Sequence, residues 1–271
     1  MTNIPLEDTV ADIVGKAMRG LQLNDEQVAT QAGVTPSAVA SLREGDYHDA
    51  TARAVAPVLH LGVEALAALG HQSWRPRPVT VAGLACFNTP FQDMTVNSYL
   101  VFDRASGEAV AFDTGMDCRG MLDFLTKEKL ALKLILLTHT HADHIHDLAR
   151  LKQQTGAPAY AGDREAFAQA EPFAADREFQ CGSLRITTRL TWGHSRGGIT
   201  YVIDGLERPV AVVGDAVFAS SMGGGAVSYA DALRSNREQI LTLPAATVLC
   251  PGHGPLTTVG EEQVHNPFFI A

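Results

Sequence analysis

A short apolar run that ends in a cluster of histidines and aspartates constrains this chain more than any other feature. Residues 132–137 read LKLILL, and residues 138–147 read THTHADHIHD, with four histidines and two aspartates in ten positions. The apolar run is typical of a strand buried on both faces, and open α/β sheets gather ligands at the carboxyl ends of such strands. Packing alone seldom concentrates histidine, whereas imidazole and carboxylate are ordinary ligands of zinc and similar metals. The segment therefore predicts a metal site in an α/β fold.

The spacing of the cluster predicts two points of attachment. His139 and His141 are two positions apart on an extended segment and would project to the same side. Asp143 and His144 would lie in the turn that enters the next helix, expected over residues 144–155, and would be offset toward a second point. Three further motifs, each after an expected strand, add one candidate ligand each: TWGHSRGG with His194, VVGDAVF with Asp215 and PGHG with His253.

The order of these motifs resembles that of the metallo-β-lactamase-fold hydrolases. The resemblance covers residues 79–271. Within that superfamily, PGHGPLTTVGEEQVHNPFF (251–269) and TWGHSRGGITYVI (191–203) resemble the glyoxalase II-like, or hydroxyacylglutathione hydrolase-like, branch. The alternation of short strands and helices indicates only an α/β fold, whereas the resemblance implies a four-layer αββα sandwich.

The resemblance also implies a set of metal ligands and their roles. One metal ion would be held by His139, His141 and His194, the other by Asp143, His144 and His253, and Asp215 would bridge the two. Two divalent metal ions are expected. Zinc is the first choice, and iron or manganese are alternatives because the same nitrogen and oxygen ligands also accept them. A water shared by such ions has a pKa lowered toward about 7 and supplies hydroxide as the nucleophile. Asp143 and Asp215 are the predicted catalytic residues, and Asp143 could orient the hydroxide or return a proton.

Residues around these motifs are expected to support the ligands. Asp113 in FDTG is expected behind the metals, and Asn97 in VNSY is expected to have a structural role on an inner strand. His146 and Asp147 replace the Gly-Gly pair that is common after this motif. Their presence predicts a changed entry into the next helix or additional hydrogen bonds around the ligands.

Residues 1–71 differ from the rest and are expected to be entirely helical. Apolar residues recur at helical spacing, Asn24 and Thr35 are favourable N-caps, and Pro36 suits a first helical position. The stretch LNDEQVATQAGVTPSAVASLREG resembles the helix-turn-helix of the Cro and lambda-repressor-like family. Two prolines within RPRP make residues 72–78 the expected linker to the catalytic domain, residues 79–271.

Charge argues against nucleic acid and membrane surfaces as partners. The helical region holds nine acidic residues against four basic ones, and its expected reading helix, TPSAVASLRE, offers a single arginine. The whole chain has a formal net charge of −9. DNA binding is therefore not expected despite the helix-turn-helix pattern, and packing, dimerisation or covering of the second domain is the expected role. A homodimer is compatible with the apolar positions of the helical region.

The amino-terminal stretch lacks the basic segment followed by an apolar segment that is typical of a leader, so a cytoplasmic location is expected.

The expected activity is that of a dinuclear-metal hydrolase whose hydroxide attacks an ester-like carbonyl, a thioester or lactone, of a small-molecule substrate. The sequence SSMGGG, residues 220–225, is expected to be a flexible lid or an open mouth, because Gly224 stands where glyoxalase II-like enzymes carry an arginine. Two alternatives remain open. One is a mononuclear iron enzyme resembling persulfide dioxygenases, with His139, His194 and Asp215 as ligands. The other is a ligand-sensing helix-turn-helix regulator with a metal-binding domain.

Overall fold

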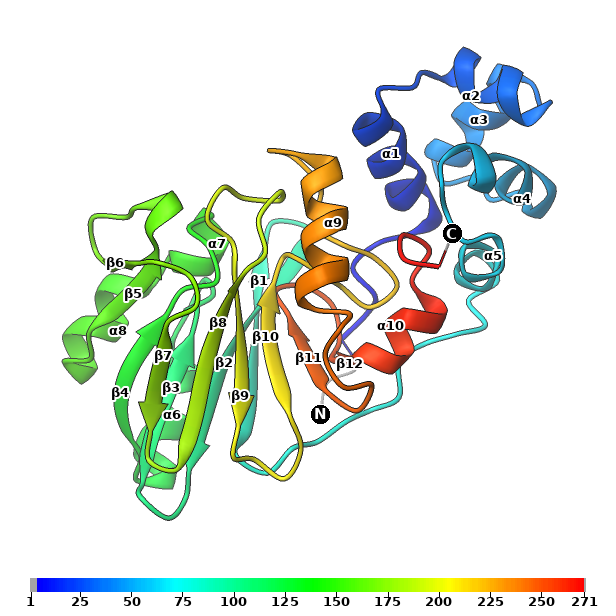
Figure 1. The fold of residues 1–271 in the computed structure, drawn as a ribbon. Helices are drawn as coiled ribbons and strands as arrows, with labels where there is room; N and C mark the ends of the chain where they lie inside the picture. Colours follow the sequence, from blue (N-terminus) through cyan, green and yellow to red (C-terminus); the bar gives the residue numbers. More distant parts are fainter. Residues whose placement is uncertain (1–3, 271) are drawn as a thin grey trace.

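The computed structural model describes residues 4–270, and its first part is helical (Figure 1). The helices are α1 (Val10–Leu21), α2 (Asp25–Ala32), α3 (Pro36–Arg43), α4 (Asp49–Val58) and α5 (Val63–Gly70). Asn24 caps α2 by accepting a hydrogen bond from the backbone of Gln27, and Thr35 caps α3 in the same way. Within the described part of the chain, no helix is long and apolar enough to cross a membrane.

Two six-stranded sheets form the centre of the fold. The first has the order β1-β2-β3-β4-β5-β6 and consists of β1 (Leu84–Phe91), β2 (Met94–Asp103), β3 (Glu108–Phe112), β4 (Ala131–Leu136), β5 (Ala159–Gly162) and β6 (Glu171–Phe173). The second has the order β12-β11-β10-β9-β8-β7 and consists of β7 (Glu178–Cys181), β8 (Leu184–Leu190), β9 (Ile199–Asp204), β10 (Val210–Gly214), β11 (Val248–Pro251) and β12 (Thr257–Thr258). Strands β3 to β6 pair in parallel, as do β10 and β11, so their carboxyl ends share an edge.

Helices cover the outer faces of both sheets. Side chains such as Phe112, Tyr201 and Val212 fill the space between the sheets. The first sheet is covered by α6 (Arg119–Glu128) and α8 (Leu148–Thr155), and the second by α9 (Tyr229–Gln239) and α10 (Val259–His265). The predicted four-layer αββα sandwich is therefore confirmed, and Figure 1 shows the helices flanking the paired sheets.

The helix predicted after the histidine cluster is interrupted. Instead of one helix over residues 144–155, the chain forms α7 (Ala142–Ile145) and then α8. Asp147 causes the break: its Oδ2 accepts a hydrogen bond from the backbone of Cys118 at 2.9 Å, and its own N–H donates to Thr114 Oγ1 at 3.2 Å. These bonds take the backbone out of the helix and tie the end of the cluster to the segment after β3.

The helical region shares its core with the sandwich. Buried residues of α1 to α5 pack in one cluster with Met222, Ala232 and Phe268, which belong to the second part of the chain. A Cβ placed on Gly20 of α1 would lie 2.2 Å from Cγ of Tyr229 on α9, so glycine permits the close approach there. Figure 1 shows these helices beside α9, α10 and the C-terminal end. The linker boundary at residues 72–78 stays a prediction.

We predict that Phe268→Ala destabilises the whole chain and not one part of it. Phe268 is 1% exposed within the shared cluster, and truncation of a buried phenylalanine costs about 3–5 kcal/mol in free energy of unfolding. Urea unfolding of the metal-free protein, followed by circular dichroism, should show one transition that shifts to lower urea. Two transitions, of which the substitution lowers only one, would show that the regions unfold independently.

Candidate metal centre

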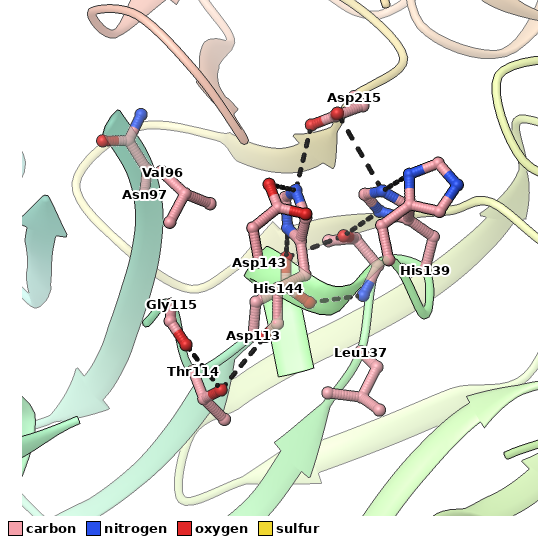
Figure 2. Close-up of polar contacts among 12 residues, drawn as sticks. Val96, Asn97, Asp113, Thr114, Gly115, Leu137, His139, Asp143, His144 and Asp215 are labelled. Carbon is pink, nitrogen blue, oxygen red and sulfur yellow. Dashed lines mark hydrogen bonds and ion pairs between the residues drawn. The ribbon is translucent and has the colours of Figure 1, made fainter. Parts of the chain in front are cut away.

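The seven predicted ligands come together at the shared edge of the two sheets. His139 and His141 follow β4, Asp143 and His144 lie in α7, and the remaining three follow β8, β10 and β11: His194, Asp215 and His253. They form two adjoining groups, within each of which one ligand atom per residue lies within 4.8 Å of the others. Figure 2 shows Asp215 above both His139 and His144.

The first group presents three ring nitrogens to one point. Nδ1 of His141 lies 3.0 Å from Nε2 of His139 and 3.0 Å from Nε2 of His194. Tetrahedral zinc with Zn–N bonds near 2.0–2.1 Å holds its nitrogens about 3.3 Å apart, so the spacing fits a common ion. Oδ2 of Asp215 lies 3.3 Å from Nε2 of His194 and completes the group.

The second group shares the same aspartate. Oδ2 of Asp143 lies 3.5 Å from Nε2 of His144 and 3.3 Å from Nε2 of His253. Asp215 approaches these two histidines as well, with Oδ1 3.3 Å from Nε2 of His144 and Oδ2 3.5 Å from Nε2 of His253. Asp215 therefore contacts both groups, as a bridging carboxylate would.

Two buried atoms at this junction test whether a metal fits. Nε2 of His144 and Oδ1 of Asp215 have no hydrogen-bond partner in the described residues, although both are buried. Nδ1 of His144 lies 2.8 Å from Oδ2 of Asp113, a carboxylate that only accepts, so Nδ1 donates its proton to Asp113 and Nε2 is the ring nitrogen left to bind a metal. An unsatisfied buried group costs about 1–3 kcal/mol. A cation between these atoms would satisfy both, so the residues fit a metal.

The electrostatics of the junction also favour positive charge. Burial by itself would lower the pKa of His144 and His253, but Asp215 and neighbouring carboxylates raise these pKa values to about 10 and about 11. Without metal both rings are therefore protonated at neutral pH, and a bound cation would take the place of the proton on Nε2. Burial raises the pKa of Asp215, yet His144 and His253 hold that pKa well below its ordinary value. In the first group burial lowers the pKa of His139 and His194, which keeps both rings neutral and able to bind a metal.

The family of the chain follows from its sequence as well as from this geometry. The profile of the metallo-beta-lactamase superfamily matches residues 92–253, more than half of the chain. The chain belongs to this superfamily. Membership confirms the predicted class of protein, a metal-dependent hydrolase. The match leaves the helical region outside, so the helix-turn-helix resemblance of that region stays a prediction.

Three similar proteins illustrate the range of this superfamily. The probable metallo-hydrolase YqgX of Bacillus subtilis is 28% identical over 205 residues, which are 66% of this chain and 94% of that protein. The hydroxyacylglutathione hydrolase-like protein of Gallus gallus is 32% identical over 162 residues, 57% of this chain and 56% of that protein. The crystal structure of ETHE1 from Myxococcus xanthus aligns with a TM-score of 0.60 and 25% identity, over 69% of this chain and 88% of that one.

Asp113 orients one histidine of each group. Its Oδ2 accepts hydrogen bonds from Nδ1 of His144 at 2.8 Å and from Oγ1 of Thr138 at 2.7 Å, and its Oδ1 accepts from the backbone of Thr138 at 2.8 Å. Because Thr138 Oγ1 donates to Asp113, it accepts from Nδ1 of His139 at 3.1 Å. This chain of bonds leaves both Nε2 atoms free for a metal, and Figure 2 shows Asp113 beside His144.

Backbone carbonyls orient two other ligands. Nδ1 of His253 lies 2.8 Å from the carbonyl of Thr95, and Nδ1 of His194 lies 3.0 Å from the carbonyl of Gly224. Asn97 supports the loop of His253 by donating to the carbonyls of Pro251 and Gly254 at 3.0 and 2.8 Å. The structural role expected for Asn97 thus corresponds to contacts seen in the structure.

The loop at residues 220–225 differs from its prediction. Ser220, Ser221 and Met222 are buried, and a Cβ on Gly223 would lie 2.0 Å from the carbonyl oxygen of Asp215 and 2.8 Å from Nδ1 of His194. The expectation of a flexible lid or open mouth is wrong for this part of the loop, because it packs against two ligands.

Sequence reasoning also missed Glu165. Its Oε1 accepts a hydrogen bond from Oγ1 of Thr140 at 2.7 Å, and its Oε2 accepts from the backbone of Gly197 at 3.0 Å. Glu165 thereby joins the loop of His139 and His141 to the loop of His194. It stands in a short 3-10 turn without a motif, so no local signal in the sequence marks it.

We predict that Asp113→Asn weakens metal binding by about 10- to 100-fold. An amide offers one acceptor oxygen where the carboxylate offers two, so at least one of the three donors loses its acceptor and the rings of His139 and His144 lose their fixed tautomers. Competition with a chromophoric chelator measures the affinity.

Asp103→Asn is the matched control for this experiment. Asp103 also accepts hydrogen bonds from two backbone N–H groups, those of Ala105 and Ser183, but it lies at the far end of β2 from the ligands. Wild-type affinity in both variants would show that Asp113 does not orient the ligands.

Proposed function

We propose that the protein hydrolyses an ester-like carbonyl, a thioester or a lactone, with two divalent metal ions held by its seven clustered side chains. The observation that carries the proposal is the position of Asp215, whose carboxylate lies 3.3 Å from a histidine of each group. A site for one ion would need no such bridge. When bound, such a pair lowers the pKa of a shared water toward about 7 and polarises the substrate carbonyl.

The side chains of the site have separate roles in proton transfer and in orienting the ligands. Asp143 is the one acid of the second group, and its carboxylate can take a proton from the attacking water and return it to the leaving group. The paths from His139 and His144 to Asp113 keep these rings in the tautomer that exposes Nε2. Burial of His139, His144 and Asp215 excludes bulk water from these three side chains, which strengthens their electrostatic interactions.

The ester-like substrate class is supported by two kinds of likeness. The motifs around His194 and His253 resemble the glyoxalase II-like branch, and a similar protein carries the name hydroxyacylglutathione hydrolase-like protein. Gly224 stands where that branch has an arginine, so a cationic clamp at this position is missing. We therefore propose an acyl substrate in general and do not commit to glutathione as its carrier. Zinc is the proposed ion, with iron or manganese as substitutes.

A second candidate is a mononuclear iron enzyme that consumes oxygen, like the persulfide dioxygenases. Its ligands would be His139, His194 and Asp215, all of which belong to the first group. The likeness to ETHE1 at 25% identity fits this candidate. The second group would then have no metal to hold, which leaves the orphaned nitrogen of His144 unexplained.

We predict near two equivalents of metal per chain for the wild type and near one for His253→Ala. His253 belongs only to the second group, so its removal should empty that site and leave the first. Elemental analysis of protein purified without added metal measures the content, and a panel of thioesters and lactones measures hydrolysis.

His146→Ala is the control, because His146 lies beside the cluster without belonging to either group. This variant should keep two equivalents of metal. A single iron that His253→Ala does not change, together with oxygen consumption on a glutathione persulfide, would replace the proposed hydrolase by the second candidate.

A further inference from the structure

The segment ahead of α1 runs along the loop that carries His253. The side chain of Glu7 is largely buried, and its Oε2 lies 4.0 Å from Nδ1 of His253. A Cβ placed on Gly254 would lie 3.3 Å from the backbone nitrogen of Glu7. The helical region therefore reaches the edge of the metal centre, although more than 240 positions of sequence separate these residues.

The next acid, Asp8, joins Lys16 of α1 to the loop after β10. The carboxylate of Asp8 pairs with Nζ of Lys16 and accepts a hydrogen bond from Oγ of Ser221. Nζ of Lys16 also donates to the carbonyl of Met222 at 2.9 Å and lies 5.2 Å from the centre of the Phe218 ring. Both charged side chains are largely buried. The two residues of the helical region thus hold the loop 218–224 at several points.

The same loop contacts one ligand of each metal group. The carbonyl of Gly224 accepts the Nδ1–H of His194 at 3.0 Å, which turns Nε2 of that ring toward the first group. The ring of Phe218 lies edge-on to the ring of His253, with centroids 5.6 Å apart and planes at 83°. A displacement of the loop would therefore move or release His194 and remove a packing partner of His253.

The opposite side of the loop is held by α10 and the residue after it. Asn266 Nδ2 donates to the carbonyl of Ser221 at 2.7 Å, and Oε2 of Glu262 accepts from the backbone of Ser220 at 3.0 Å. Ser220 has a φ of 63°, a left-handed conformation that a serine keeps only when its surroundings impose it. The loop is thus fixed between α10 on one side and, on the other, the ion pair of Lys16 in α1 with Asp8, which lies just ahead of α1.

We propose that Lys16 and Asp8 are positioning residues of the metal centre. By holding the loop 218–224, they keep His194 and His253 oriented for metal, so the helical region completes the centre and does not merely adjoin it. The inference rests on the proposed function, because it assigns these residues to the same two metal groups. A buried ion pair often adds little to stability compared with apolar residues of similar size, so stability alone does not account for this pair.

The double variant Asp8→Asn with Lys16→Met tests the inference, because it removes the pair without leaving one charge buried alone. We expect metal affinity to fall by about tenfold or more and the visible spectrum of the cobalt-substituted protein to change, because His194 is no longer held in one orientation. In the metal-free protein, the ¹⁵N signals of His194 should shift from a single Nδ1–H tautomer toward a mixture. The single variant Lys16→Arg keeps Asp8 and a positive charge beside it, so it should retain most of the metal affinity of the wild type.

The control is Asp25→Asn with Arg43→Met, which removes an ion pair between α2 and α3 that does not contact the loop. This variant should keep the metal affinity, the cobalt spectrum and the His194 tautomer of the wild type. An Asp8 and Lys16 variant that keeps all three properties would overturn the inference. Failure of the wild type to bind a second ion would contradict the proposed function, whereas the tautomer of His194 in metal-free protein would still decide the role of Lys16 and Asp8.

Discussion

The structure depends on one electrostatic arrangement, a buried aspartate that lies between imidazoles from separate loops. Asp215 is 8% exposed and contacts both histidine groups, and its charge is stabilised by His144 and His253. Such a carboxylate would be costly to bury without positive partners. Four strand ends must therefore deliver their side chains to one point, and the placement of β4, β8, β10 and β11 in two packed sheets makes this convergence available.

Convergence of strands alone would not orient the rings. Asp113 fixes His144 directly and His139 through Thr138, while Glu165 joins two ligand loops to each other. The bonds to His144 and His139 leave one nitrogen of each ring facing the centre. The site is therefore organised by groups that do not themselves face the proposed metals, and these groups lie directly after β3, after β4 and in the turn after β5.

The helical region is joined to this centre by apolar and by polar contacts. Its buried side chains share a cluster with α9 and the chain end, while Asp8 and Lys16 contact the loop that follows Asp215. Packing, dimerisation or covering of the second domain is expected for this region from its sequence, and the shared cluster shows packing. The resemblance of this region to a helix-turn-helix stays a prediction, and its acidic composition offers little to a phosphate backbone.

The sequence alone determined the class of fold, the helical start and the set of candidate ligands, because these depend on local patterns. Apolar runs, caps such as Asn24, and motifs with His139 or His253 can be recognised from neighbouring residues in the sequence, without knowledge of what lies nearby in space. Tertiary structure decided what depends on distant groups. Asp147 breaks a helix because Thr114 and Cys118 bind it, and Glu165 and Lys16 acquire roles only when their loops meet. The sequence predicts a flexible lid or an open mouth at residues 220–225, yet residues 220–223 are packed, since Gly223 allows close approach to Asp215 and His194.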